Sequence, residues 1–143
     1  MNGNGTMLAG VALFLAAIGW VLLQQGPDET VPAPEDGTLM VRVTVPADLS
    51  AEAEMGKQAF EAACVTCHGE NAAGRHGMGP PLIHKIYEPG HHADMAFQLA
   101  VQNGVRSHHW RFGDMPPVEG LTRADVASIV TYVREVQREN GID

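Results

Sequence analysis

The chain has 143 residues, which is enough for one compact domain with additional segments but not for two full domains. Hydrophobic residues make up 45% and charged residues 18%, so a disordered or collagen-like chain is excluded, and two cysteines are too few for a disulfide scaffold. Nine Lys and Arg against 17 Asp and Glu give a net charge of −8, the wrong sign for binding nucleic acid through its phosphates.

The N-terminal segment is apolar and has the length of a membrane span. It carries no charged side chain before Asp28, and residues 7–23 read MLAGVALFLAAIGWVLL. A helix over residues 6–25 would rise about 30 Å, enough to cross the hydrocarbon core of a bilayer. A cleaved signal peptide competes with this interpretation, but residues 2–6 lack the basic side chains that usually precede one. We therefore predict a single transmembrane anchor over residues 1–25.

Residues 26–47 favour an extended linker that ends in one short strand. Prolines and carboxylates are concentrated in the stretch QQGPDETVPAPEDG, which disfavours packed structure. Apolar residues then occupy every second position from Leu39 to Val45, a period of two that predicts a strand over 39–45, which Pro46 ends. A lone strand is expected to lie against its own domain.

The remaining residues, 48–143, predict helices joined by loops rich in glycine and proline. Ser50 is a suitable N-cap for a first helix that runs towards Cys64. A second helix is expected over 93–103, because Gly104 follows it and is typical of a helix end.

The last helix has the clearest start in the sequence. Thr122 and Asp125 have the spacing of a capping box, and apolar residues at helical spacing follow them. The domain is therefore predicted to be all-α, with loops so long that a further component is needed to complete the core.

The motif C-V-T-C-H at residues 64–68 is the strongest chemical signal in the chain. Its two thiols and its imidazole project from about one helical turn. Thioether bonds from Cys64 and Cys67 can clamp one edge of a haem, while His68 reaches the iron as its proximal axial ligand. A zinc site that recruits further histidines and a disulfide between the two cysteines are the alternatives, and both are less favoured.

Residues 48–143 resemble the class I c-type cytochromes. Besides the motif at 64–68, the glycine and aromatic residue at Gly56 and Phe60 are similar to the family's first helix, and Tyr132 is similar to the aromatic residue of its last helix. The resemblance implies a helical domain wrapped round one covalently attached haem c.

Two loops extend the resemblance and imply further roles. The motif G-P-P-L around Pro80 is similar to a family loop whose proline carbonyl accepts a hydrogen bond from the proximal imidazole, so Pro80 would orient His68. The motif G-D-M-P-P resembles the family's methionine loop, which implies Met115 as the distal iron ligand. Met78 and Met95 are the less favoured alternatives.

Histidine is more frequent after the attachment motif than the family pattern requires. These residues are His76, His84, His91, His92, His108 and His109. Exposed loop positions are the simplest interpretation. Three alternatives stay open: one imidazole replaces Met115 on the iron; His108, His109, Trp110 or Arg106 contacts the haem propionates; or copper binds the histidines.

A haem with two protein ligands has no open position for oxygen or peroxide, so we predict a one-electron carrier and not an enzyme. The sequence contains no nucleophile–base pair, paired acids or phosphate-binding loop. Covalent haem attachment takes place in an exported compartment. The resemblance therefore implies a haem domain on the periplasmic side of a bacterial inner membrane, held there by the single-pass anchor.

The expected function is that of a tethered shuttle between membrane-bound respiratory complexes. A quinol-oxidising complex would lie upstream, and a terminal oxidase or reductase downstream. One alternative is a fixed haem c subunit of a larger membrane oxidoreductase complex. A histidine-rich copper-handling or sensing protein is a weaker alternative.

Overall fold

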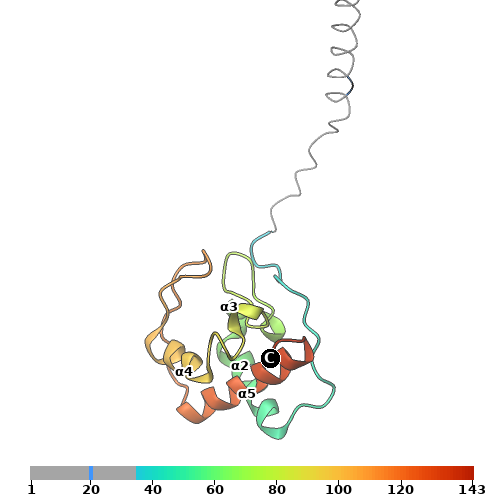
Figure 1. Cartoon of the computed structure of the whole chain (residues 1–143). Helices are drawn as coiled ribbons and strands as arrows, with labels where there is room; N and C mark the ends of the chain where they lie inside the picture. The colour runs from blue at the N-terminus through green and yellow to red at the C-terminus, as the bar shows by residue number, and fades with distance from the viewer. Residues whose placement is uncertain (1–19, 21–34) are drawn as a thin grey trace, which may run out of the picture. The chain divides into compact units, whose positions relative to one another are not determined.

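The computed structural model describes Trp20 and residues 35–143 (Figure 1). The described residues from 35 onward belong to one compact unit. Nearly all of the predicted anchor at 1–25, together with the first part of the predicted linker, lies outside the described residues. Within the described part of the chain, no helix is both long enough and apolar enough to cross a bilayer.

The three longer helices that the sequence predicts are present. In chain order the described elements are α2 (Ala51–Ala63), α3 (Val65–His68), the 3-10 helices η1 (Glu70–Ala72) and η2 (Lys85–Tyr87), α4 (Asp94–Asn103) and α5 (Arg123–Glu139). The Ser50 hydroxyl accepts a hydrogen bond from the third residue of α2, and Thr122 and Asp125 form a complete capping box on α5. The starts of α2 and α5 were therefore predictable from capping residues close to them in the sequence.

Helices α2 and α5 cross at very close range and form the centre of the core (Figure 1). A Cβ added to Gly56 of α2 would lie 1.8 Å from the carbonyl oxygen of Ser128, so only glycine fits at the crossing. Beside it, the rings of Phe60 and Tyr132 pack with centroids 5.8 Å apart, and both side chains are buried.

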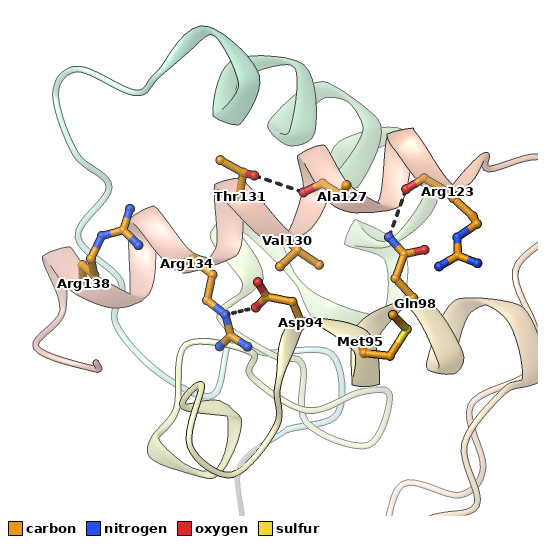
Figure 2. Close-up of a pocket in the computed structure, with 9 residues that line it drawn as sticks. All are labelled: Asp94, Met95, Gln98, Arg123, Ala127, Val130, Thr131, Arg134 and Arg138. Carbon is orange, nitrogen blue, oxygen red and sulfur yellow. Dashed lines mark hydrogen bonds and ion pairs between the residues drawn. The ribbon is translucent and has the colours of Figure 1, made fainter.

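Helix α4 is fixed to α5 by polar contacts along a surface groove of about 460 Å³ (Figure 2). Arg134 Nε donates to Asp94 Oδ1 over 2.8 Å, and Gln98 Nε2 donates to the carbonyl of Arg123 over 2.9 Å. The Arg134 guanidinium also stacks over the ring of Phe97 at 5.1 Å. These contacts come from both ends of the groove and set the position of α4.

Arg134 is itself buried and connects α5 to the loop that precedes α4. Its Nη1 donates to the carbonyl of Tyr87 and to Gln137 Oε1, both over 2.6 Å, and its Nη2 donates to the carbonyl of His92 over 2.5 Å. Gln137 is fully buried and donates to the carbonyl of Leu82 over 2.8 Å. The network supplies donors to carbonyls of this loop that its own backbone turns leave unpaired.

The predicted strand over 39–45 is not formed. Leu39 makes one isolated antiparallel bridge with Arg75, and the amide of Val41 donates to the carbonyl of Ala73 over 3.1 Å. The chain opposite this segment is a glycine-rich loop that turns away, so the pairing cannot continue as a ladder.

The alternating pattern of this segment matches burial in its second half but not at its start, because Leu39 is exposed. Val43 and Val45 pack against the core, while Thr44 between them is exposed. The backbone of Thr44 exchanges two hydrogen bonds with the Asn140 side chain, of 3.0 and 2.7 Å. The described residues 35–47 therefore lie in the same compact unit as the residues that follow.

Candidate functional site

One mainly apolar cavity of about 440 Å³ collects the predicted site residues. Cys64, Cys67, His68, Pro80 and Met115 all line it. Aliphatic and aromatic side chains make up much of the remaining wall, among them Phe60, Leu82, Phe97, Leu99, Val126 and Ile129. A cavity of this size and lining lies within the range of about 300–1,000 Å³ that is usual for bound cofactors.

The attachment motif occupies the junction of α2 and α3. Cys64 is the C-cap of α2, where its amide donates to the carbonyl of Phe60, and its own carbonyl accepts from the amide of His68 over 2.9 Å. This tight junction keeps the motif on about one helical turn. Burial, and then the neighbouring Cys67, raises the pKa of the Cys64 thiol to about 11.

His68 is held in one orientation by the loop at Pro80. Its Nδ1 lies 2.9 Å from the carbonyl oxygen of Pro80, and donation to that oxygen leaves Nε2 free to bind a metal. Burial lowers the pKa of His68, and the bond to Pro80 opposes this shift only in part, so the ring is neutral at pH 7. Gly79 permits the approach, because a Cβ there would lie 2.6 Å from the carbonyl oxygen of Cys67.

Met115 reaches the cavity from the long loop before α5. A pair of 2.9 Å backbone hydrogen bonds joins it to Val105, so the intervening residues form a closed loop. Asp114 Oδ1 also accepts from the amide of Ser107 over 2.8 Å, which fixes the neighbouring backbone. Met78 lines the same cavity, whereas Met95 lies on the groove between α4 and α5 (Figure 2).

Trp110 supplies an observation that fits a bound group with acceptor atoms. Its Nε1 is buried, and it has no hydrogen-bond partner among the described residues. Burial raises the pKa of Tyr87, and proximity to Trp110 partly offsets this rise. The contact between Tyr87 and Trp110 does not have hydrogen-bond geometry, so it leaves Trp110 Nε1 unpaired. Because a buried N–H seldom stays unpaired, the carboxylates of a haem are suitable acceptors for it.

The histidines divide between this cavity and other surroundings. His92, His108 and His109 line it, whereas His84 caps η2 and packs edge-on against Trp110 at 5.4 Å. Desolvation lowers the pKa of His109, and the charges of the neighbouring histidines lower it further. His76 is bonded to its surroundings through its backbone. Arg106, a predicted propionate contact, is exposed and does not line the cavity.

Several lining residues were not predicted from the sequence. Tyr87, Phe97 and Phe112 all face the cavity, and the ring of Phe112 stacks on Trp110 at 5.8 Å. Loop aromatics have no periodicity that would assign them to a face. The concentration of aromatic residues near the histidine pairs is the signal that could have found them.

The comparison with known families agrees with this geometry. The model of the cytochrome c family matches residues 53–137, more than half of the chain. The chain therefore belongs to the cytochrome c family and carries covalently attached haem c at Cys64 and Cys67. Members of this family are typically electron carriers and work with redox protein partners. No curated protein matches the chain significantly.

Proposed function

We propose that this cytochrome is a membrane-tethered shuttle on the periplasmic side of a bacterial inner membrane. It moves single electrons from a quinol-oxidising complex to a terminal oxidase or reductase. The bound haem supplies the one-electron chemistry. The observation that supports the proposal is the meeting of His68 and Met115, from distant parts of the sequence, at one cavity that the attachment cysteines border.

In this proposal the protein would supply both ligands of the iron. His68 would hold it through Nε2, with the Pro80 carbonyl orienting the ring, and Met115 would hold it through its thioether sulfur. Because both positions belong to the protein, no site is left for a small substrate, which favours electron transfer over catalysis. The closed loop from Val105 to Met115 limits the rearrangement that accompanies a change of oxidation state.

Absorption spectra of the oxidised holoprotein test this ligand set. Sulfur ligation gives a weak far-red band, which should disappear in Met115→Ala. Met95→Ala is the matched control, because that side chain lies outside the cavity, and it should keep the band. Loss of the band in Met78→Ala, together with its retention in Met115→Ala, would show that Met78 and not Met115 binds the iron.

Surface charge supports docking to an acidic partner on the side of the methionine loop. Exposed Arg106 and Arg111 in this loop stand against Asp114, whereas the first helix presents one lysine against three glutamates, at Lys57, Glu52, Glu54 and Glu61. Such a difference orients collisions at low ionic strength. Electron-transfer rates should fall as salt increases, and rates that do not change would exclude steering.

The tether is tested by fractionation of cells. The full chain should be found in the membrane fraction. A chain without residues 1–25, exported by the cleavable signal of another protein, should be found in the soluble periplasm. Equal distributions of the two proteins would contradict the anchor. Co-purification with a large complex at constant stoichiometry would instead indicate a fixed haem c subunit.

A further inference from the structure

Four histidines from two loops converge at the edge of the haem cavity. His91 and His92 precede α4, and His108 and His109 belong to the loop before α5. The His109 ring lies at the centre of the group, with its centroid 5.3 Å from that of His91, 5.4 Å from that of His92 and 4.3 Å from that of His108. Such a convergence of imidazole rings is not expected of exposed loop histidines that share no role.

The spacing of the nitrogens matches metal coordination better than hydrogen bonding. Nε2 of His91 lies 3.4 Å from Nε2 of His109, and the ligand atoms of these two residues and His92 all lie within 4.8 Å of one another. A tetrahedral metal with bonds of about 2.05 Å holds its nitrogens about 3.3 Å apart. For comparison, an N–H···O hydrogen bond normally joins its donor and acceptor over about 2.7–3.2 Å.

Backbone carbonyls already fix the tautomers that a metal would require. Nδ1 of His92 lies 2.6 Å from the carbonyl oxygen of Ile86, and Nδ1 of His108 lies 2.9 Å from that of Arg106. Donation from Nδ1 leaves Nε2 as the free ligand atom, which is the usual arrangement around metal-bound histidines. Arg134 adds support from α5, because it donates to the carbonyl of His92.

We propose that His91, His92 and His109 form a binding site for one divalent transition-metal ion, with Zn²⁺ the best match to the spacing. His108 lies beside these three residues, with its ring centroid 4.3 Å from that of His109, but it is not one of the group whose ligand atoms all lie within 4.8 Å. Imidazole nitrogens select zinc or copper over calcium and magnesium, which prefer oxygen. The site borders the haem cavity, since His92 and His109 also line that cavity. It is separate from the iron ligands and does not depend on the proposed electron transfer.

Titration of the untagged holoprotein with Zn²⁺ tests the site. Calorimetry together with metal analysis should show one Zn²⁺ per chain. Each of His91→Ala and His109→Ala should weaken binding at least tenfold, and the double variant should abolish it. Both side chains are exposed, so these variants should fold. His76→Ala is the matched control, because this histidine lies outside the cluster, and it should bind as the natural protein does.

Spectroscopy separates the two metals of the protein. Absorption at the zinc edge should show nitrogen neighbours at about 2.0–2.1 Å with the scattering pattern of imidazole. The haem spectrum should be the same in the double variant as in the natural protein. Cu²⁺ should bind more tightly than Zn²⁺ at the same histidines, as the general order of metal affinities requires.

Three results would overturn the proposal. The first is the absence of stoichiometric Zn²⁺ binding to the natural protein. The second is undiminished binding to the double variant, which would place the metal elsewhere. The third is a changed iron ligation in His91→Ala or His109→Ala, because the imidazoles would then serve the haem.

Discussion

The crossing of α2 and α5 and the wall of the haem cavity are built in different ways. At the crossing, the contacts between Gly56 and Ser128 and between Phe60 and Tyr132 are made within the protein itself. The wall formed by residues 84–115, which consist of α4 and the segments on either side of it, instead faces a cavity and is organised by a few polar contacts. One region therefore depends on side-chain packing, and the other depends on haem and on the buried Arg134 network.

Removal of the attachment thiols should have the largest effect and should separate the two regions. In Cys64→Ser/Cys67→Ser the covalent haem is lost, and the apolar cavity is left without its contents. Hydrogen exchange measured by mass spectrometry should show loss of protection over 84–115, with more protection kept in α2 and α5. Thr66→Ser, in the same motif, should behave as the natural protein does. Equal loss of protection in both regions would contradict the distinction.

Substitution at the helix crossing should give the next largest effect. Gly56→Ala places a methyl group 1.8 Å from a backbone oxygen and should lower the free energy of unfolding by about 3 kcal/mol or more. Gly90→Ala is the matched control, because a Cβ there has no neighbour within 4 Å among the described residues. Its effect should lie within about 0.5 kcal/mol of zero. Chemical denaturation of the two holoproteins checks the difference, and similar midpoints would refute the close approach.

The cavity wall should respond most to loss of the buried guanidinium. Arg134→Met removes the donor to the carbonyl of His92 and to Gln137 Oε1, while the carbonyl of Tyr87 keeps its bond from Gln137, and it should cost about 3 kcal/mol. Arg138→Met, on the same helix and at the same surface groove, should cost less than about 0.5 kcal/mol (Figure 2). Denaturation curves give the costs, and faster hydrogen exchange over 84–94 in the first variant should localise the damage. Equal costs would show that the network contributes little.

The capping box should give the smallest effect, and it should depend on pH. Thr122→Ala should cost about 1 kcal/mol at pH 7, while Thr131→Ala in the helix interior should be close to neutral. Hydrogen bonds from the Thr122 side chain, and then from its backbone, hold the pKa of Asp125 below its ordinary value of 3.8.

Because this pKa is lower in the folded state, the contribution of Asp125 is present above pH 3.8 and is lost as the pH falls through the folded-state value. The difference between Thr122→Ala and the natural protein should therefore shrink on acidification. Unfolding curves at a series of pH values test this prediction. A stability difference that grows as the pH falls would contradict it.

The sequence predicted what depends on local spacing. The caps at Ser50 and Thr122, the end of α4 at Gly104 and the attachment motif all follow from residues close together in the chain. The hydrogen bond between His68 and Pro80 agrees with a motif that the family resemblance supplied.

What the sequence did not predict depends on contacts between distant segments. The alternation identified a buried face over 43–45, but it also placed the exposed Leu39 on that face and could not show that the opposite chain is a loop. The histidine pairs were visible, but the meeting of His91 with His109 arises from the path of two irregular loops. In the sequence Arg134 is one more polar residue of α5, because the two backbone carbonyls and the carboxylate that surround it come from another part of the chain.

The two hydrogen bonds between Asn140 and the backbone of Thr44 place a late residue of the chain against an early one. During synthesis, the ribosome must release residue 140 before this contact can form. The same holds for α5, which supplies half of the crossing with α2. A nascent chain that has passed residue 68 therefore exposes both cysteines before the domain can close. The order of synthesis thus leaves the attachment site accessible while the body of the protein is still incomplete.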